Sequence, residues 1–130
     1  VQNEAFFARA QPVDSHKAVA AMRKLAKELG VFGLLPEDRE SWTFKQLYAF
    51  IEAAALAGKD RGIYGTSLYA GSQTSDDIMY TLMLSNGGKI LSDDRTECLA
   101  NSPECVEIVE MLKKINDNGY CVPGAASSAA

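Results

Sequence analysis

The sequence predicts an α/β fold in which helices pack on a small mixed sheet. Segments with apolar residues at three- and four-residue spacing alternate along the chain with short runs of β-branched and aromatic residues. The stretch from Gly62 to Asp93 shows this alternation in full, because a strand pattern, a polar loop, an apolar helix, a Gly-Gly stop and a second strand pattern follow one another. A chain of 130 residues fits one domain with one core. Together these observations favour a single α/β domain.

Two helical patterns precede residue 31. Residues 3–10 form the weaker pattern, with Phe6 and Phe7 as its apolar anchor. The stronger pattern begins near Ser15 and stops at Gly30. Its apolar stripe consists of Val19, Met22, Ala26 and Leu29. Basic residues fill the remaining positions, and we interpret them as a solvated face.

The next helix has a well-defined predicted start. Thr43 and Gln46 are spaced as a capping box, while Trp42 and Leu47 are spaced as a hydrophobic staple. A single apolar stripe then continues to Gly58, where we expect the helix to end. Because Trp42 has the staple position, we predict that it is a buried structural residue rather than a ligand platform.

The central stretch predicts a strand and a buried helix. Residues 63–69 have the β-branched and aromatic content of a strand. Asp76 and Asp77 fall in the first turn of the following helix, where the helix dipole favours negative charge. Residues 78–84 are apolar on nearly every side, which predicts burial between layers. A second short strand is expected at 89–91.

The last third of the chain predicts a hairpin, a helix and a short strand. Residues 96–99 pair with the preceding strand across a polar turn. Ser102 caps the next helix, Gly119 ends it, and residues 120–122 add a final strand. The buried face of this helix is predicted to contain Val106, Ile108, Val109, Met111, Leu112 and Ile115.

Composition excludes several partner classes. The net charge of −4 and the isoelectric point near 5.0 argue against nucleic acid, whose binding requires a basic face. No apolar run approaches the roughly 20 residues that span a bilayer. Residues 1–10 lack the order of a signal peptide, so we expect a soluble or already processed chain.

The cysteines do not indicate a metal site. Cys98, Cys105 and Cys121 match no zinc-binding spacing when the only histidine is His16. A disulfide between Cys98 and Cys105 would leave Cys121 free if the protein is exported. The adjacent aspartates at 93–94 lack the further oxygen ligands of a calcium loop. We therefore predict neither a metal nor another cofactor.

Catalytic motifs are also absent from the sequence. It contains no G-x-S-x-G, H-E-x-x-H, G-x-x-x-x-G-K-[ST] or G-x-G-x-x-G pattern. His16 lies among lysines on a helix that we expect to be exposed, so no Ser-His or Cys-His pair is supported. The sequence predicts that this chain is not an enzyme.

Four segments in order resemble a known family. They are LLPEDRESWTFKQL, GIYGTSLYAGSQTSDD, LMLSNGGKILSDD and NSPECVEIVEMLKKINDNGYCVPGAAS. The series is similar to the maltose-binding-like group (family 1) of extracellular solute-binding proteins, which serve ABC importers. The resemblance implies that residues 34–127 are part of a periplasmic-binding-protein-like second lobe, incomplete without the rest of a parent chain. Residues 1–33 would be a helical N-terminal segment, with an insertion into the family's pattern as one interpretation, and residues 128–130 a tail.

The resemblance also implies a binding site and a location. Carried onto this chain, the ligand contacts of the family are Ser72, Gln73, Asp76, Asp77 and Tyr80. The polar groups suit paired hydrogen bonds to sugar hydroxyls, and Tyr80 offers a ring face to a pyranose. Each also has a structural interpretation as a cap, a loop residue or a core residue. The resemblance places the protein outside the cytoplasm, in the periplasm or as a membrane-anchored cell-surface lipoprotein.

The function implied by the resemblance is capture of a sugar or oligosaccharide for an ABC permease. The site would lie between this lobe and the missing other lobe of the parent protein. An alternative is a protein-interaction or assembly module that self-associates through exposed sheet edges. A sugar hydrolase is less favoured, since Asp76 and Asp77 at the start of one helix point in different directions.

Overall fold

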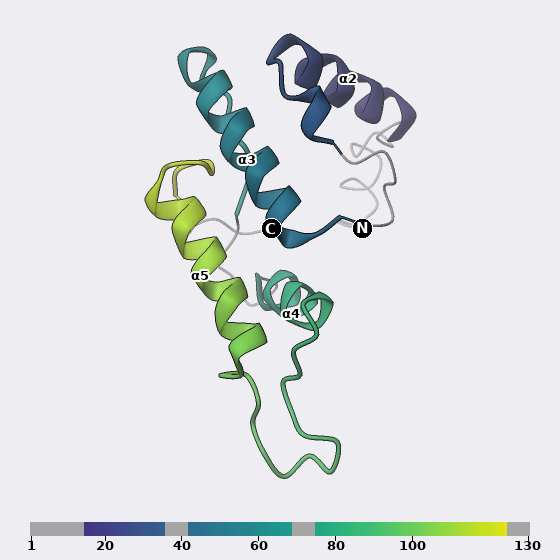
Figure 1. Cartoon of the computed structure of the whole chain (residues 1–130), viewed down its shortest axis with the longest axis vertical. Helices are drawn as coiled ribbons and strands as arrows, with labels where there is room; N and C mark the ends of the chain where they lie inside the picture. The colour runs from purple at the N-terminus through teal and green to yellow at the C-terminus, as the bar shows by residue number, and fades with distance from the viewer. Residues whose placement is uncertain (1–14, 36–41, 69–74, 125–130) are drawn as a thin grey trace, which may run out of the picture.

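The described part of the chain is helical. The computed structural model describes residues 15–35, 42–68 and 75–124, and Figure 1 shows these segments as coloured ribbon. The elements in order are α2 (Ser15–Glu28), the short 3-10 helix η1 (Phe32–Leu34), α3 (Phe44–Gly58), the 3-10 helix η2 (Lys59–Arg61), α4 (Ser75–Ser85) and α5 (Pro103–Asp117). The predicted helix at 3–10 and the tail at 128–130 lie outside the described residues.

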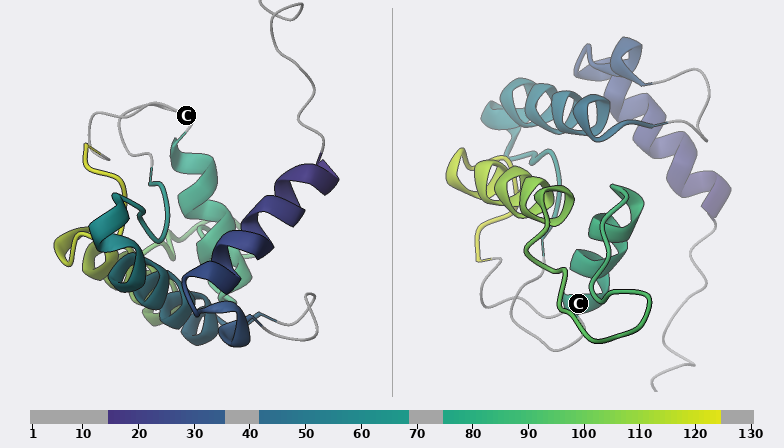
Figure 2. Two further views of the ribbon diagram at one scale, coloured as in Figure 1. Left: turned by 90° about the horizontal axis from the view of Figure 1, so that it is seen from above. Right: turned by 60° about the horizontal axis from the view of Figure 1, so that its bottom comes forward.

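Helix α3 lies at the centre of the arrangement. It packs along α5 on one side, and α5 in turn packs against α4 (Figure 1). On the other side, α2 reaches α3 through η1 and diverges from it, as both views in Figure 2 show. The molecule is therefore a chain of helix pairs rather than a closed bundle.

The predicted start of α3 is confirmed. The backbone N–H of Gln46 donates to Thr43 Oγ1 over 3.2 Å, and the backbone N–H of Thr43 donates to Gln46 Oε1 over 2.9 Å. These reciprocal bonds satisfy two backbone donors that a helix start leaves without partners. The Trp42 ring meets Phe50 edge-on, with 6.0 Å between ring centroids. Trp42 therefore packs two turns along the helix and marks the face of α3 that is turned toward α2.

The buried residues form three small clusters instead of one core. Each cluster joins one pair of neighbours and contains few fully enclosed side chains. The first cluster joins α2 and α3, and its buried members are Ala26, Val31 and Ala54. The second joins α3 and α5 through Ile51, Ile115 and Cys121. The third joins α4 and α5 through Met83, Cys105 and Ile108. Since the clusters follow one another across the molecule, much apolar surface stays at the faces of the helices.

The predicted α/β fold was wrong, because the described residues contain no strand and no sheet. The segment predicted as the first strand makes one parallel bridge, between Thr66 and Cys121. The bonds around it are Gly65 N–H to the Tyr120 carbonyl at 2.8 Å and Val122 N–H to the Thr66 carbonyl at 3.1 Å. No strand longer than this single bridge forms here among the described residues.

The predicted hairpin is also reduced to one bridge, between Leu91 and Cys98. Asp94 Oδ1 accepts from the Thr96 N–H at 3.2 Å and from the Thr96 hydroxyl at 2.8 Å, and Ser92 Oγ accepts from the same N–H at 3.1 Å. The Ser92 and Asp94 side chains thus accept hydrogen bonds from the Thr96 backbone N–H. In a longer hairpin, backbone N–H groups would instead donate to carbonyls of the opposite strand. A tight polar turn results, without a sheet edge.

The predicted burial of α4 was wrong as well. Ile78 is 42% exposed and Leu84 is 56% exposed, whereas Met83 is 6% exposed. Among the described elements only α5 packs closely against α4, so one face of this helix is covered. Helix α4 therefore has apolar residues on nearly every side but is buried on one side only.

The buried face of α5 is rotated about the helix axis relative to the face that the sequence predicted. Cys105, Ile108 and Ile115 are at most 1% exposed, while Val106 and Val109 are 41% and 44% exposed. Because each residue advances the helix by about 100°, Cys105 and Val106 cannot lie on one face. The cysteine is the residue that packs between α4 and α5.

Candidate functional site

The structure describes three of the five predicted sugar-binding residues, all on α4. Ser72 and Gln73 lie outside the described residues. Asp76 and Asp77 occupy the first turn of α4, as expected for residues that favour a helix start, and both are exposed. Tyr80 is 43% exposed on the same helix. These three α4 residues line neither of the two cavities described below.

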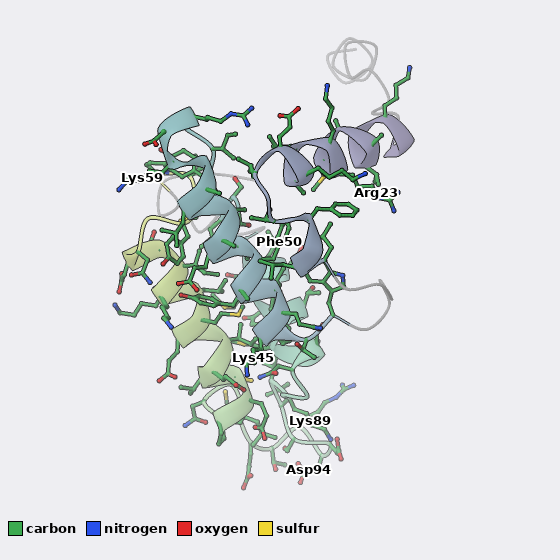
Figure 3. All side chains as sticks on the ribbon, turned by 45° about the horizontal axis from the view of Figure 1, so that its top comes forward. Arg23, Lys45, Phe50, Lys59, Lys89 and Asp94 are labelled. Carbon is green, nitrogen blue, oxygen red and sulfur yellow. The ribbon has the colours of Figure 1, made fainter. Side chains whose placement is uncertain are left out.

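A groove between α2 and α3 is the larger cavity, with a volume of about 620 Å³. We call it the α2–α3 groove. Figure 3 labels Arg23 and Phe50, which line it from α2 and α3. Its lining is mostly apolar and consists of Val19, Met22, Arg23, Ala26, Phe32, Leu35, Trp42, Leu47, Phe50, Ile51, Gly65 and Thr66.

The groove arises from the sizes of the residues at the two ends of α2. At its C-terminal end the small side chains of Ala26 and Ala54 meet in a buried cluster with Val31. Here α2 ends at a glycine with positive φ, Gly30, and the Val31 N–H donates to the Ala26 carbonyl over 2.9 Å. Toward its N-terminal end the bulkier Met22 faces the cavity instead of a neighbouring helix. The helices therefore touch at one end and separate at the other.

Large apolar side chains in the groove remain open to solvent. Met22 is 69% exposed, Val19 is 40% exposed and Phe32 is 38% exposed. Single exposed apolar residues are common on proteins, but a contiguous set that lines one hollow indicates a binding surface. Burial of these side chains would be favourable by about 25 cal/mol for each Å² removed from water.

The rim of the groove is basic. Helix α2 contains four basic residues and one acidic residue, a net charge of +3, although the whole chain carries −4. The Lys27 ammonium lies 4.8 Å from the centre of the Phe32 ring, which binds it to the groove wall through a cation–π contact. Glu28, the acidic residue, accepts a bond from Arg61 at 3.5 Å. Arg23 in the lining and Lys27 over Phe32 thus place positive charge beside the apolar surface.

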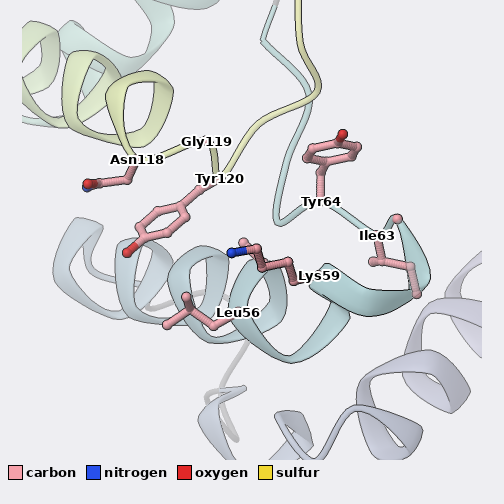
Figure 4. A pocket seen from close by; sticks show the side chains of 9 residues that line it. Leu56, Lys59, Ile63, Tyr64, Asn118, Gly119 and Tyr120 are labelled. Carbon is pink, nitrogen blue, oxygen red and sulfur yellow. The ribbon is translucent and has the colours of Figure 1, made fainter.

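A smaller cavity of about 240 Å³ lies where the C-terminal ends of α3 and α5 meet, and we call it the α3–α5 end pocket. Figure 4 shows its lining side chains. They come from the end of α3, the segment after η2 and the residues after α5: Ala55, Leu56, Lys59, Gly62, Ile63, Tyr64, Asn118, Gly119 and Tyr120. Tyr120 donates its hydroxyl to Glu52 Oε1 over 2.8 Å, and this bond raises the pKa of the Tyr120 phenol.

Two glycines allow the segment after η2 to approach α3 closely. A Cβ atom on Gly65 would lie 2.1 Å from the Ile51 carbonyl oxygen, and one on Gly58 would lie 2.6 Å from the Ile63 Cβ atom. Both distances are shorter than Cβ atoms show in proteins, so a side chain at either position would require the neighbouring atoms to move. The segment carrying Tyr64 is thereby pressed onto α3.

The three thiols are unpaired, so the Cys98–Cys105 disulfide considered for an exported protein is not present in this structure. Cys98 is exposed, whereas Cys105 and Cys121 are 0% and 3% exposed. The Cys105 thiol donates to the Lys89 carbonyl and the Cys121 thiol to Asn116 Oδ1, neither of which is a base. Within the described ranges no group of histidine, cysteine and carboxylate side chains is arranged to hold a metal ion. The helices described are also too short or too polar to cross a bilayer.

Sequence reasoning missed the α2–α3 groove although it identified most of its residues. Trp42 was predicted to be a buried staple residue, and the stripe containing Val19 and Met22 was predicted to face the protein. In the structure all three line the groove. The excess of basic residues on α2 was the available signal, and it was interpreted as a solvated face.

Comparison with known proteins gives one partial likeness. The chain is 41% identical over 66 residues to N-carbamoylputrescine amidase of Arabidopsis thaliana. This match covers 51% of the chain and 21% of the plant protein, so the chain spans about a fifth of that relative. No family model matches the chain, and no solved structure matches it.

These findings correct the family resemblance. Nothing in them points to a solute-binding protein, and the relative found is an amidase. The implied sugar capture for an ABC permease is therefore unsupported, and with it the role of Asp76, Asp77 and Tyr80 as sugar contacts. The alternative of self-association through sheet edges also loses its basis, because the described residues form no sheet.

Proposed function

We propose that this chain is a non-catalytic docking module that binds an acidic, amphipathic α-helix of a partner protein in the α2–α3 groove. The observation that carries the proposal is the exposed apolar lining, above all Met22 at 69% exposure, beside a basic helix. Grooves with methionine and aromatic linings accept the apolar face of a helix and adapt to its shape.

The spacing of the lining residues supports a helix as the occupant. On α2, Met22 follows Val19 by three positions and Ala26 follows Met22 by four. On α3, Phe50 and Ile51 follow Leu47 by three and four positions. Two such stripes on diverging helices leave room for a third helix, which would complete a small bundle. An extended peptide would instead need an open strand edge, which the described residues lack.

The charge distribution supports an acidic occupant. The net charge of +3 on α2 stands against −4 for the whole chain, so the groove is bordered by a basic helix of an acidic protein. Charge complementarity favours an acidic partner and disfavours a basic one. Acidic residues flanking the apolar face of the incoming helix would meet Arg23, which lines the groove, and Lys27, which lies over Phe32.

The surroundings of the thiols support a role without catalysis. A nucleophilic cysteine requires a base or a positive group that stabilises the thiolate. Among the described residues, Cys105 and Cys121 are buried against a carbonyl and an amide oxygen.

The proposal is tested by isothermal titration with a helical peptide. The peptide would place leucine and phenylalanine on one face and glutamate on the other, and a second peptide would carry lysine in place of every glutamate. We expect micromolar binding of the acidic peptide and at least tenfold weaker binding of the basic one.

Three variants locate the binding. Arg23→Glu and Met22→Ala change exposed groove residues and should each weaken the acidic peptide about five- to tenfold. Lys59→Glu makes the same charge change outside the groove and should leave its affinity within twofold. Equal binding of both peptides, or equal effects of Arg23→Glu and Lys59→Glu, contradicts the proposal.

The likeness to N-carbamoylputrescine amidase favours a second candidate, amide hydrolysis. It predicts that the chain releases ammonia from N-carbamoylputrescine. The docking proposal predicts a rate equal to that of buffer, whether or not the acidic peptide is present. A rate above buffer that disappears on Cys98→Ala would replace the docking proposal with a catalytic one.

A further inference from the structure

We propose that the α3–α5 end pocket is a second, independent binding site, and that it takes a small aromatic carboxylate. The ring of the ligand would lie against Tyr64 and Tyr120, and its carboxylate would pair with the Lys59 ammonium. Nothing in this inference depends on the α2–α3 groove, because the two cavities share no lining residue.

The size of the pocket suits one ring with one substituent. An apolar cavity of about 150 Å³ accepts a benzene ring. The end pocket has about 240 Å³, which leaves space beyond a ring for a group as small as a carboxylate. A longer chain or a fused ring system would extend into solvent.

The lining offers both stacking faces and polar partners. Tyr64 is among the lining residues and is 41% exposed, so part of this side chain is accessible to a ligand. Leu56, 61% exposed, adds an apolar contact (Figure 4). Aromatic rings favour offset or edge-on contacts with other rings, which two tyrosines on separate segments can supply together.

The charges around the pocket favour an anion. In the described structure the Lys59 ammonium has no ion-pair partner, whereas neighbouring Arg61 is paired with Glu28. Glu52 is the acidic residue that is hydrogen-bonded to the pocket lining. Its Oε1 atom accepts a hydrogen bond from the Tyr120 hydroxyl, so one of its two carboxylate oxygens already has a partner. The side-chain amide of Asn118 adds a neutral donor to the lining.

The walls of the pocket are fixed before a ligand arrives. The Tyr120 carbonyl accepts from the Gly65 and Thr66 N–H groups at 2.8 and 3.3 Å, which joins the two segments that carry the tyrosines. The Ile63 N–H donates to the Gly58 carbonyl over 3.0 Å and joins one of these segments to α3. A preformed site loses little conformational freedom on binding, so a small ligand can bind measurably.

The test is titration of the isotopically labelled full chain with benzoate, followed by amide chemical shifts in NMR spectra. Benzamide provides a neutral ligand of the same shape, and benzylammonium provides a cation. We expect saturable shifts at residues 55–65 and 118–120 with benzoate at a Kd on the order of 1 mM. Benzamide should bind at least fivefold more weakly, and benzylammonium should cause no saturable shift.

Two variants and one control distinguish the proposed contacts from a general effect of charge. Lys59→Met keeps the apolar stem and should abolish the preference for benzoate over benzamide, while Tyr64→Ala should weaken both ligands about fivefold. Lys45→Met is the matched control, since Lys45 is exposed toward the other end of α3 (Figure 3). The proposal is overturned if benzoate shifts residues elsewhere, if both ligands bind equally, or if Lys59→Met keeps the preference.

Discussion

The short distance between Gly65 and the Ile51 carbonyl oxygen predicts that a side chain at position 65 destabilises the protein. Substitution Gly65→Ala places a Cβ atom 2.1 Å from the Ile51 carbonyl oxygen, and this atom must retreat by about 0.9 Å to reach 3.0 Å. The neighbour is helix backbone and cannot rotate away. The movement strains the Gly65 N–H bond to the Tyr120 carbonyl, which is 2.8 Å long, and disturbs the packing of Ile51 against Ile115.

The expected cost follows from these two effects. Overpacking costs about 1–3 kcal/mol and a weakened backbone hydrogen bond about 1 kcal/mol more, so we expect a loss of about 3 kcal/mol. Gly62→Ala is the matched control in the same segment. Gly62 has φ of +65° with open space around its Cβ position, so alanine there meets only the left-handed backbone penalty of about 1 kcal/mol.

Urea-induced unfolding, followed by circular dichroism at the helical minimum, measures both losses. A Gly65→Ala variant whose unfolding free energy lies within about 0.5 kcal/mol of Gly62→Ala would refute the close approach of this segment to α3.

Three further predictions concern the core, the thiols and the pocket wall. Ile108→Ala should destabilise the chain by about 2–4 kcal/mol and Val109→Ala by under about 1 kcal/mol in the same urea assay, because their side chains are 1% and 44% exposed; equal losses would contradict the phase of α5. Cys98 should react at once with a thiol reagent in the native protein, and the two buried thiols only after urea is added; three equal native rates would contradict their burial. The hydrogen bond to Glu52 raises the pKa of Tyr120 in the folded protein above its value in the unfolded chain. The stability that this bond contributes is therefore complete below the pKa of an ordinary tyrosine, and it is lost as the pH rises through the pKa of the folded protein. Phenolate absorbance should show the Tyr120 titration moving to lower pH in Glu52→Gln, and an unchanged titration would contradict the bond.

Local signals in the sequence predicted the helices well. The capping box of Thr43 and Gln46 set the start of α3, and Gly30 and Gly119 ended α2 and α5 with positive φ. These signals depend on residues within one turn of each other, so they act whatever the rest of the chain does.

The strands could not be predicted because a strand depends on its partner. Residues 63–69 have suitable side chains, yet the described part of this segment pairs with residues 120–122 through one bridge. Around Leu91, polar side chains of the turn take the backbone donors that a ladder requires. β-propensity describes a fit to neighbours, and these neighbours are short.

The candidate site was missed for a related reason. The stripe with Val19 and Met22 predicts an apolar face, but the sequence does not say whether another helix covers it. That outcome depends on where α2 meets α3, and contact through Ala26 and Ala54 leaves the other end open. A groove between two helices is a property of their crossing.

The fluorescence of Trp42 tests the docking proposal most directly. It is the only tryptophan of the chain and lines the α2–α3 groove beside Phe50, so an occupant must change its surroundings. We predict that the acidic helical peptide shifts the Trp42 emission to shorter wavelength and protects it from acrylamide, with saturation at the affinity found by titration. An acidic peptide that binds without changing the emission or quenching of Trp42, or that does not bind, would contradict docking in this groove.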